Sequence, residues 1–341
     1  MKTIGFDDFL PQGDEIRLIH RQIEERRMVH AILITGEPGT GKRTLAFLIA
    51  SALLCREQTG VPCGKCDSCR LAISGEHPDM IVIEKGKPIS PDISKGRSTI
   101  PADDIREMIR LCSQYSFQGG NRIVLIPDAE NMTPQAQNCL LKILEEPPLD
   151  TYFILTSAHP DQLIVTVKSR CRPMKLVPWE SDYIRKILEE QGIDSLKAKK
   201  AALYASGSIG NALRLAADND YWIIRENVME AFFRNRKRSD ILLYSTAWKE
   251  KKTEAATVFG ILEDCIRQLL LCRLKLENPS ILNDYPTEWL NFAEKAPLSH
   301  FSSLHEKIRD ARKQNTFNVN FQAIIEQLLL AFTGEGNLWV K

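Results

Sequence analysis

Two groups of residues in this sequence have the types and spacing that could do chemistry. The first is GEPGTGKR at residues 36–43. Its glycines let the backbone turn tightly so that N–H groups can face an anion, and the lysine is placed to reach the β- and γ-phosphates of a nucleotide. We therefore predict a phosphate-binding loop. Its candidate nucleotide-binding residues are Gly36, Gly39, Gly41 and Lys42.

The same loop lacks the hydroxyl group that would hold Mg²⁺. A working phosphate loop has Ser or Thr directly after the lysine, and this chain has Arg43. Arginine only donates hydrogen bonds, so it cannot ligate a cation. Thr44 comes one residue late and would point about 100° further round the helix. We expect a loop that is built for phosphate but poor at ATP hydrolysis.

The second group is a set of four cysteines at C-x7-C-x2-C-x2-C spacing. A C-x-x-C turn presents two sulfurs to one centre, and a second pair completes a tetrahedron around Zn²⁺. Because all four positions hold cysteine, no coordination position is left for water, which favours a structural zinc over a catalytic one. A disulfide pair or scattered thiols would suit a secreted protein better. The predicted ligands are Cys55, Cys63, Cys66 and Cys69.

A second position that could handle magnesium follows the apolar run at residues 122–126. In a hydrolysing nucleotide-binding fold, the end of this strand supplies two acidic residues that order Mg²⁺ and polarise the attacking water. Here Pro127 takes the first place and Asp128 the second. A strand end that simply turns into a loop is the plainer interpretation. Together with Arg43, this makes two independent positions that lack metal-holding groups.

The elements that must position these groups alternate between strand and helix. An apolar run precedes the glycine-rich loop and a helical pattern follows it. The alternation continues to residue 177 and implies a mostly parallel sheet covered on both faces, an α/β fold. We predict strands at 31–34, 80–84, 122–126 and 152–156, helices at 14–29, 44–50, 102–113 and 134–146, and a polar loop at 85–99.

The composition excludes several functional classes. At 341 residues the chain is long enough for two or three domains, and its 43% hydrophobic and 26% charged residues are ordinary for a globular protein. A net charge of +1 creates no global field toward nucleic acid or membrane. We find no signal-peptide pattern and no apolar run near the ~20 residues of a membrane helix. We expect a cytoplasmic protein without membrane contact, whose nine cysteines are reduced or metal-bound.

Several motifs occur here in the order found in bacterial clamp-loader subunits, which are AAA+ proteins of the DNA polymerase III holoenzyme. They are the phosphate loop, the four-cysteine insert behind its helix, LLKILEEPP at 140–148, and Ser169-Arg170-Cys171. The chain resembles this family over about residues 6–215. The resemblance implies an AAA+ parallel-sheet P-loop domain at 1–178 with a zinc module at about 55–69, a helical lid domain at 179–218, and an all-α collar domain for oligomerisation at 219–341.

Two kinds of clamp-loader subunit share these motifs. The gamma/tau motor is an intact ATPase, whereas delta-prime is similar but has decayed metal-handling positions. Arg43 and Pro127 make this chain resemble delta-prime. The motor also has a nucleotide-sensing arginine after Gly-Ser-x in the lid, and this chain has Gly210 there, with Arg214 four residues on. The resemblance therefore implies no intrinsic ATPase activity.

The resemblance also implies a role for Arg170. The Ser-Arg-Cys motif of this family supplies an arginine finger in trans, which reaches the γ-phosphate of ATP·Mg²⁺ on a neighbouring subunit. A guanidinium suits that task because it carries five fixed donors and a permanent charge. The implied partners are the gamma/tau and delta subunits, the sliding clamp indirectly, and primed DNA within the ring. The chain would be a non-hydrolysing subunit that helps load the clamp onto primed DNA in replication.

Two other functions stay open from the sequence. An active gamma/tau-type ATPase would use Lys42 with Asp128 and Glu130. A zinc-module nucleic-acid binder working alone is opposed by the net charge of +1 and by the absence of an aromatic-basic stripe. We interpret the basic run at 234–238 as a solvated face, with contact to DNA phosphates as the alternative.

The last third of the chain has an almost wholly helical pattern. Its most apolar segments are 255–276 and 323–332. They would suit equally well a collar that joins subunits into a ring and a hydrophobic core within this domain. Cys265 and Cys272 lie on the first of these segments without a second cysteine at ligand spacing, so we predict core thiols.

Overall fold

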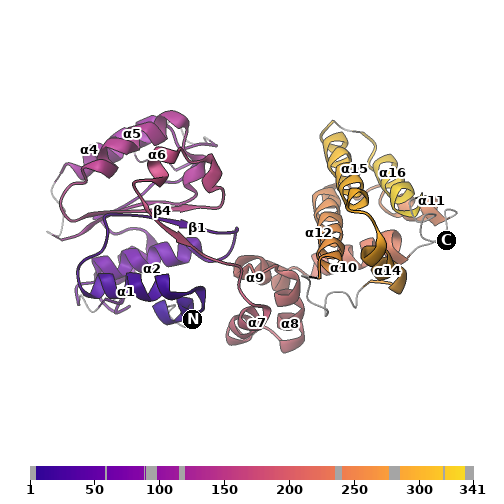
Figure 1. Cartoon of the computed structure of the whole chain (residues 1–341), viewed down its shortest axis with the longest axis horizontal. Coiled ribbons are helices and arrows are strands. Elements are labelled where there is room, and N and C mark those ends of the chain that lie inside the picture. Colours follow the sequence, from indigo (N-terminus) through magenta and orange to yellow (C-terminus); the bar gives the residue numbers. More distant parts are fainter. Residues whose placement is uncertain are drawn as a thin grey trace. The chain divides into compact units, whose positions relative to one another are not determined.

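The computed structural model describes residues 5–57, 60–87, 89, 98–114, 120–234, 240–275, 285–317 and 319–334. The chain divides into two compact units, Met1–Leu213 and Arg214–Lys341. Figure 1 shows the whole chain, and each unit is described by itself below. No helix among these residues combines the length and the apolar character needed to cross a membrane.

The first unit is built on a five-stranded parallel sheet in the order β2-β3-β4-β1-β5. Helices α1 and α2 lie on one face of the sheet, and α4, α5 and α6 lie on the other (Figure 1). The predicted parallel sheet covered on both faces is therefore confirmed. The strands are β1 (Ala31–Thr35), β2 (Met80–Val82), β3 (Arg122–Ile126), β4 (Thr151–Ser157) and β5 (Arg172–Lys175).

The central strands are short, continuous apolar runs because helices cover both of their faces. All five residues of β3 are buried, and Leu33 of β1 pairs with Leu155 of β4. Phe153 and Leu140 lie in the core between the sheet and the helices over it. The strand predicted at 80–84 is shorter than expected because the chain turns back after Ile83, where Glu84 and Lys87 form an isolated antiparallel bridge.

Strand β5 forms one edge of the described sheet. The backbone N–H of Leu176, just after the strand, donates to the Thr35 carbonyl at 2.8 Å, and the Met174 carbonyl accepts from the Thr35 hydroxyl at 3.4 Å. In the plane of the sheet, the backbone N–H groups of successive residues point alternately to the two sides of a strand. Since the N–H of Leu176 points to β1, the backbone nitrogen of residue 173 points away from β1. Pro173 has no N–H to donate, and an outward-facing edge position tolerates that loss.

Local signals in the sequence account for the helix boundaries of the first unit. The hydroxyl of Thr133 accepts from the Ala136 N–H at 3.2 Å and caps α5, and Pro134 occupies its first turn. The helix predicted at 14–29 ends earlier, because Arg26 adopts a left-handed φ of 55°. The helices are α1 (Asp14–Glu24), α2 (Lys42–Leu54), α3 (Asp67–Ser74), α4 (Ala102–Cys112), α5 (Pro134–Glu145), α6 (Val165–Lys168), α7 (Ser181–Glu190), α8 (Ser195–Tyr204) and α9 (Ile209–Ala217), with short 3-10 turns at Phe6–Gln12, Ala129–Asn131 and Pro160–Gln162.

The described part of the second unit is entirely helical, as predicted. Its core includes an aromatic cluster in which Phe233 lies 4.8 Å from Trp289 and 5.7 Å from Phe332, measured between ring centroids. The helices are α10 (Asn219–Val228), a π-helical turn (Met229–Arg234), α11 (Ile241–Ala247), a 3-10 turn (Lys252–Glu254), α12 (Ala255–Arg273), α14 (Thr287–Lys295), α15 (Leu298–Thr316) and α16 (Phe321–Gly334).

Two sequence predictions concern side chains of this second unit. Cys265 is buried, as predicted, whereas Cys272 is only half-buried, so the prediction of a core thiol is wrong for that residue. In the basic run at 234–238, Arg234 pairs with Glu226 and lies 3.6 Å from Glu230. The rest of that run lies outside the described residues.

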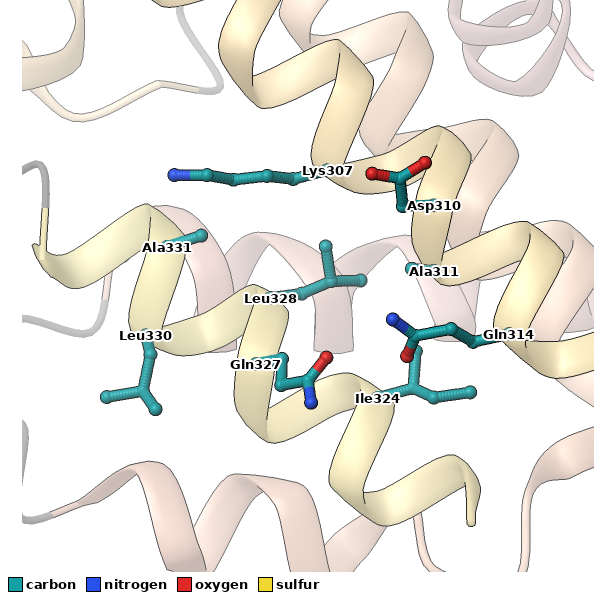
Figure 2. Close-up of a pocket in the computed structure, with 9 residues that line it drawn as sticks. All are labelled: Lys307, Asp310, Ala311, Gln314, Ile324, Gln327, Leu328, Leu330 and Ala331. Carbon is teal, nitrogen blue, oxygen red and sulfur yellow. The ribbon is translucent and has the colours of Figure 1, made fainter. Parts of the chain in front are cut away.

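A groove of about 430 Å³ lies between α15 and α16. Figure 2 shows the Leu328 side chain pointing into the space between the two helices, with Asp310 and Gln314 on the α15 side and Gln327 on the α16 side. Of the described residues that line it, Asp310 and Lys307 carry charge. The candidate site residues predicted from the sequence all lie in the first unit.

Candidate functional site

The predicted phosphate loop joins β1 to α2, and its three glycines all have positive φ. The φ angles are 150° at Gly36, 75° at Gly39 and 95° at Gly41. Residues with a Cβ rarely adopt such angles, so the path of the loop depends on these glycines. A Cβ atom added to Gly36 would also lie 2.7 Å from the Leu176 carbonyl oxygen. The structure thus places this loop where the sequence predicts it.

The lysine of the loop is turned back onto its own backbone. Lys42 is only 6% exposed, and its Nζ donates to the carbonyls of Gly36 at 2.7 Å and Glu37 at 2.9 Å. Burial lowers the pKa of Lys42, and the negative charges of Asp128 and Glu130 oppose that shift. An ammonium group has three donors, and two of those of Lys42 are engaged by carbonyls of its own loop.

The start of α9 closes over the loop. The Gly210 N–H donates to the Gly39 carbonyl at 3.0 Å, and the indole N–H of Trp179 donates to the Thr40 carbonyl at 2.8 Å. The Ser208 hydroxyl lies so near that a Cβ atom added to Gly39 would sit 2.2 Å from it. A Cβ atom at Gly210, the position of the motor's sensing arginine, would lie 3.2 Å from the Gly39 Cα. Glycine at position 210 therefore allows this close approach.

Arg43 forms an ion pair where a hydrolysing loop would hold Mg²⁺. Its guanidinium pairs with the largely buried carboxylate of Glu84, and the second oxygen of Glu84 lies 3.0 Å from Lys87 Nζ. The guanidinium also lies 5.4 Å from the centre of the Phe47 ring. The position after Lys42 thus presents positive charge and no metal-ligating oxygen.

The acidic residues after β3 make structural contacts. Asp128 has a left-handed φ of 50°, and its backbone N–H donates to the Thr156 hydroxyl at 3.1 Å. Glu130 accepts from the Ala158 N–H at 3.0 Å through Oε1. Glu130 therefore helps to hold the end of β4, and Pro127 offers no carboxylate at the position that would order magnesium.

The four predicted metal ligands lie together. The Sγ atoms of Cys55, Cys63, Cys66 and Cys69 all lie within 4.8 Å of one another, and the Cys63 and Cys69 sulfurs are 3.9 Å apart. Four sulfurs at the usual Zn–S length of about 2.3 Å would be separated by about 3.8 Å around a tetrahedral zinc. The cluster could therefore hold a metal ion of the kind that prefers tetrahedral thiolate ligands.

Backbone N–H groups around this cluster favour thiolates. The Cys66 N–H donates to Cys63 Sγ at 3.4 Å, and the Cys69 N–H donates to Cys66 Sγ at 3.3 Å. Hydrogen bonds from the backbone of Lys65 and Cys66 lower the pKa of Cys63 to about 6. Burial instead raises the pKa of Cys69. A bound cation would hold that buried thiol deprotonated, because metal ligation requires the thiolate.

Arg170 lies directly after α6, and its guanidinium is held by two elements of the same unit. Its Nε donates to Glu145 Oε1 at 2.9 Å, its Nη2 contacts the same oxygen, and its Nη1 donates to the Thr166 carbonyl at 2.9 Å. The side chain is 29% exposed. Among the described residues, no hydrogen bond or ion pair joins Arg170 to the phosphate loop, so the two candidate sites are separate.

Comparisons with known proteins agree with this arrangement. A family model described as "DNA polymerase III, delta subunit" matches residues 12–180. A second, described as "DNA polymerase III, delta subunit, C terminal", matches residues 219–334. The first match lies within the first compact unit and the second within the second unit.

Three relatives carry the same name in different bacteria. The DNA polymerase III subunit delta' of Haemophilus influenzae (strain Rd) is 30% identical over 244 residues, which are 71% of this chain and 72% of that protein. The chain belongs to the DNA polymerase III delta-prime family. The delta-prime protein of Escherichia coli (strain K12) is 37% identical over 204 residues, 59% of this chain and 58% of that protein. That of Bacillus subtilis (strain 168) is 27% identical over 320 residues, 92% of this chain and 94% of that protein.

Three contacts of this delta-prime family member were not predicted from the sequence. They are the pairing of Glu84 with Arg43, the approach of Ser208 to Gly39, and the contact of Glu145 with Arg170. Each contact joins residues from different elements, so no local sequence pattern predicts these contacts. The motif LLKILEEPP does contain Glu145. An acidic residue at the end of that helix was the one sequence signal that could have indicated a partner for Arg170.

Proposed function

We propose that this delta-prime family member is a non-hydrolysing clamp-loader subunit that supplies Arg170 in trans to an ATPase neighbour. The observation that carries the proposal is the closed phosphate loop. Lys42 binds the carbonyls of Gly36 and Glu37, while Gly210 of the lid is hydrogen-bonded to Gly39. In a subunit whose phosphate loop is bonded to its own chain in this way, we expect the contribution to ATP turnover to come from a residue outside the loop, here Arg170.

The absence of metal ligands supports the non-hydrolysing role. Phosphoryl transfer depends on Mg²⁺ between the β- and γ-oxygens and on a residue that orients the attacking water. In this chain Arg43 pairs with Glu84, Pro127 lacks a carboxylate, and Glu130 accepts a backbone N–H at the end of β4. The alternative of an active gamma/tau-type ATPase would require Arg43 and Glu130 to leave these partners when nucleotide binds, and it would still lack a carboxylate at position 127.

The contacts of Arg170 support its role as the finger. A guanidinium has five N–H donors, one on Nε and two on each terminal nitrogen. Glu145 accepts from Nε and from one N–H of Nη2, and the Thr166 carbonyl accepts from one N–H of Nη1. Within the part of the chain that the structure describes, this leaves one further donor on each terminal nitrogen. Two such donors suit two equatorial oxygens of a transferring phosphoryl group. The charge is partly exposed and therefore available to a neighbouring subunit.

The remaining parts of the proposal follow the family. We assign a structural zinc to the four cysteines, a lid to residues 179–218 and an oligomerisation collar to residues 219–341. The partners are the gamma/tau and delta subunits, with ATP·Mg²⁺ on the neighbour and primed DNA within the ring. The assembled complex would open the sliding clamp and place it on primed DNA during replication.

The test is reconstitution with candidate gamma/tau and delta subunits, followed by ATPase assays with clamp and primed DNA. Arg170→Ala should lower turnover at the completed site by roughly 10³–10⁵-fold, the usual value of an arginine finger, while the complex still assembles. Arg21→Ala is the matched control, because Arg21 is an exposed arginine of α1 that pairs only locally with Glu25. Unchanged turnover with Arg170→Ala would refute the finger. Hydrolysis by the isolated chain that Lys42→Ala abolishes would refute the non-hydrolysing role.

A further inference from the structure

A buried series of polar contacts connects the four-cysteine cluster to the sheet. Ser68 lies on α3 between two of the cysteines, and its hydroxyl is 2.7 Å from His77 Nε2. Ser68, His77 and Asp79 are exposed by only 1%, 3% and 1%. Neither the metal cluster nor the phosphate loop uses these side chains directly, and buried polar groups of this kind are retained only where they are hydrogen-bonded.

The direction of each hydrogen bond can be assigned. The backbone N–H of Asp79 donates to His77 Nδ1 at 3.1 Å. Because a backbone N–H can only donate, Nδ1 is the unprotonated nitrogen and the proton of the neutral ring lies on Nε2. Burial lowers the pKa of His77, which is consistent with a neutral ring. His77 therefore donates to the hydroxyl oxygen of Ser68.

This direction excludes a nucleophilic role for the serine. A Ser-His-Asp set used in catalysis needs the imidazole to accept the serine proton. Here Nε2 already carries a proton, and the acidic residue contacts the ring through its backbone N–H. All three residues are also closed off from solvent. The contacts serve to hold Ser68 in place.

The far end of the series is fixed to the sheet. The Asp79 carbonyl accepts from the Ile123 N–H of β3 at 2.9 Å, and the His77 carbonyl accepts from the Met80 N–H of β2 at 2.9 Å. The Asp79 carboxylate lies 3.9 Å from Arg122, whose guanidinium also donates to the carbonyls of Leu111 and Gln114. His77 thus lies just before β2 and is hydrogen-bonded to it, whereas Ser68 lies in the first turn of α3, between Cys66 and Cys69.

We propose that His77 is a positioning residue for the four-cysteine metal site. Its hydrogen bond to Ser68 holds the start of α3, and with it the sulfurs of Cys66 and Cys69, at the correct distance from Cys55 at the end of α2. Without it, the two halves of the site would have to be brought together when the metal binds, and the cost would appear as weaker binding. The inference rests on the zinc site proposed above but is independent of the role of Arg170.

The test measures zinc affinity of the full chain by competition with a chromophoric chelator. Ser68→Ala removes the hydroxyl that accepts from His77 and should weaken zinc binding by about 10-fold, at the lower end of the range for residues outside the ligand set. Ser74→Ala is the matched control, because Ser74 lies on the same helix but is exposed and bonds only to local groups. It should bind zinc as the parent chain does.

Two further variants separate positioning from general damage to the fold. His77→Ala should weaken zinc binding in the parent chain but cause little further loss in the Ser68→Ala background. His77→Gln should restore part of the affinity, since its amide can donate toward Ser68 and accept from the Asp79 N–H. The Co²⁺-substituted proteins should keep the absorption of tetrahedral thiolate coordination.

Equal zinc affinity for Ser68→Ala and Ser74→Ala would overturn the positioning role. So would fully additive losses for Ser68→Ala and His77→Ala, because independent damage would then explain both. A parent chain that binds no zinc would overturn the metal site itself together with this inference. A chain that binds zinc with equal affinity in all variants would overturn the positioning role alone.

Discussion

The closed phosphate loop predicts an energetic coupling between Gly39 and Ser208. Replacing Gly39 by alanine forces a residue with a Cβ into a φ of 75°, at a cost of about 1–2 kcal/mol. The new Cβ would also lie 2.2 Å from Ser208 Oγ, so that hydroxyl must move. Ser208 Oγ accepts from the Asn211 N–H at 3.1 Å at the start of α9, and loss of such a cap costs about 1 kcal/mol. Gly39→Ala should therefore destabilise the first unit by about 2–3 kcal/mol.

The same substitution should cost less when the hydroxyl is already absent. In the Ser208→Ala background, the next atoms that the Cβ would meet are the Asn211 nitrogen and the Gly210 Cα, both at 3.5 Å, which is an ordinary contact. Only the backbone strain of about 1–2 kcal/mol then remains. The two substitutions should therefore show a coupling energy of about 1 kcal/mol, a size typical of residues in direct contact.

Urea unfolding provides the assay. Trp179 is the one tryptophan in residues 1–213 of the sequence, and its indole donates to the Thr40 carbonyl of the loop. The ¹⁹F signal of fluorotryptophan at this position therefore reports on unfolding of the first unit alone. Additive costs, with a coupling energy of less than about 0.3 kcal/mol, would refute the close contact between the start of α9 and the loop.

Three further predictions concern the metal-handling positions. Arg43→Ser should leave the isolated chain without ATPase activity, because Lys42 still binds its own loop; a malachite-green phosphate assay that detected turnover would contradict this. Chelation of zinc, or Cys63→Ser with Cys66→Ser, should remove one metal ion per chain and lower the melting temperature of the first unit; calorimetry showing an unchanged transition in the metal-free protein would argue against a structural role. In the metal-free protein, alkylation of Cys63 should rise as the pH increases through about 6, where its thiol becomes a thiolate, and level off by about pH 7. Cys171, whose pKa burial raises to about 12, should stay unreactive over that range in peptide mapping by mass spectrometry.

The features that the sequence predicts well are those set by neighbouring residues. The positive φ angles at Gly36, Gly39 and Gly41 are a local requirement of the loop, so the motif locates it correctly. The four cysteines lie within fifteen residues, so their spacing is enough to identify them as one set of ligands. The helix that begins after Thr133 is equally local, because the cap and the following proline are adjacent.

The features that the sequence does not predict depend on tertiary packing. Ser208 and Gly39 are far apart in the chain, and Ser208 reaches Gly39 only in the folded first unit. The contacts of Glu84 with Arg43 and of Ser68 with His77 likewise join separate elements. A contact between two elements needs only one side chain from each element. Such a contact therefore leaves no periodic pattern in the sequence from which it could be predicted.

The proline in β5 limits how copies or neighbours of this chain can associate. An exposed strand edge usually invites pairing by another chain, since its free N–H and C=O groups act as a template. A strand that approached the outer side of β5 would meet the pyrrolidine ring of Pro173 where it needs a donor. That edge therefore resists intermolecular sheet growth and the aggregation that follows from it. Subunits that join this chain there must do so through side chains.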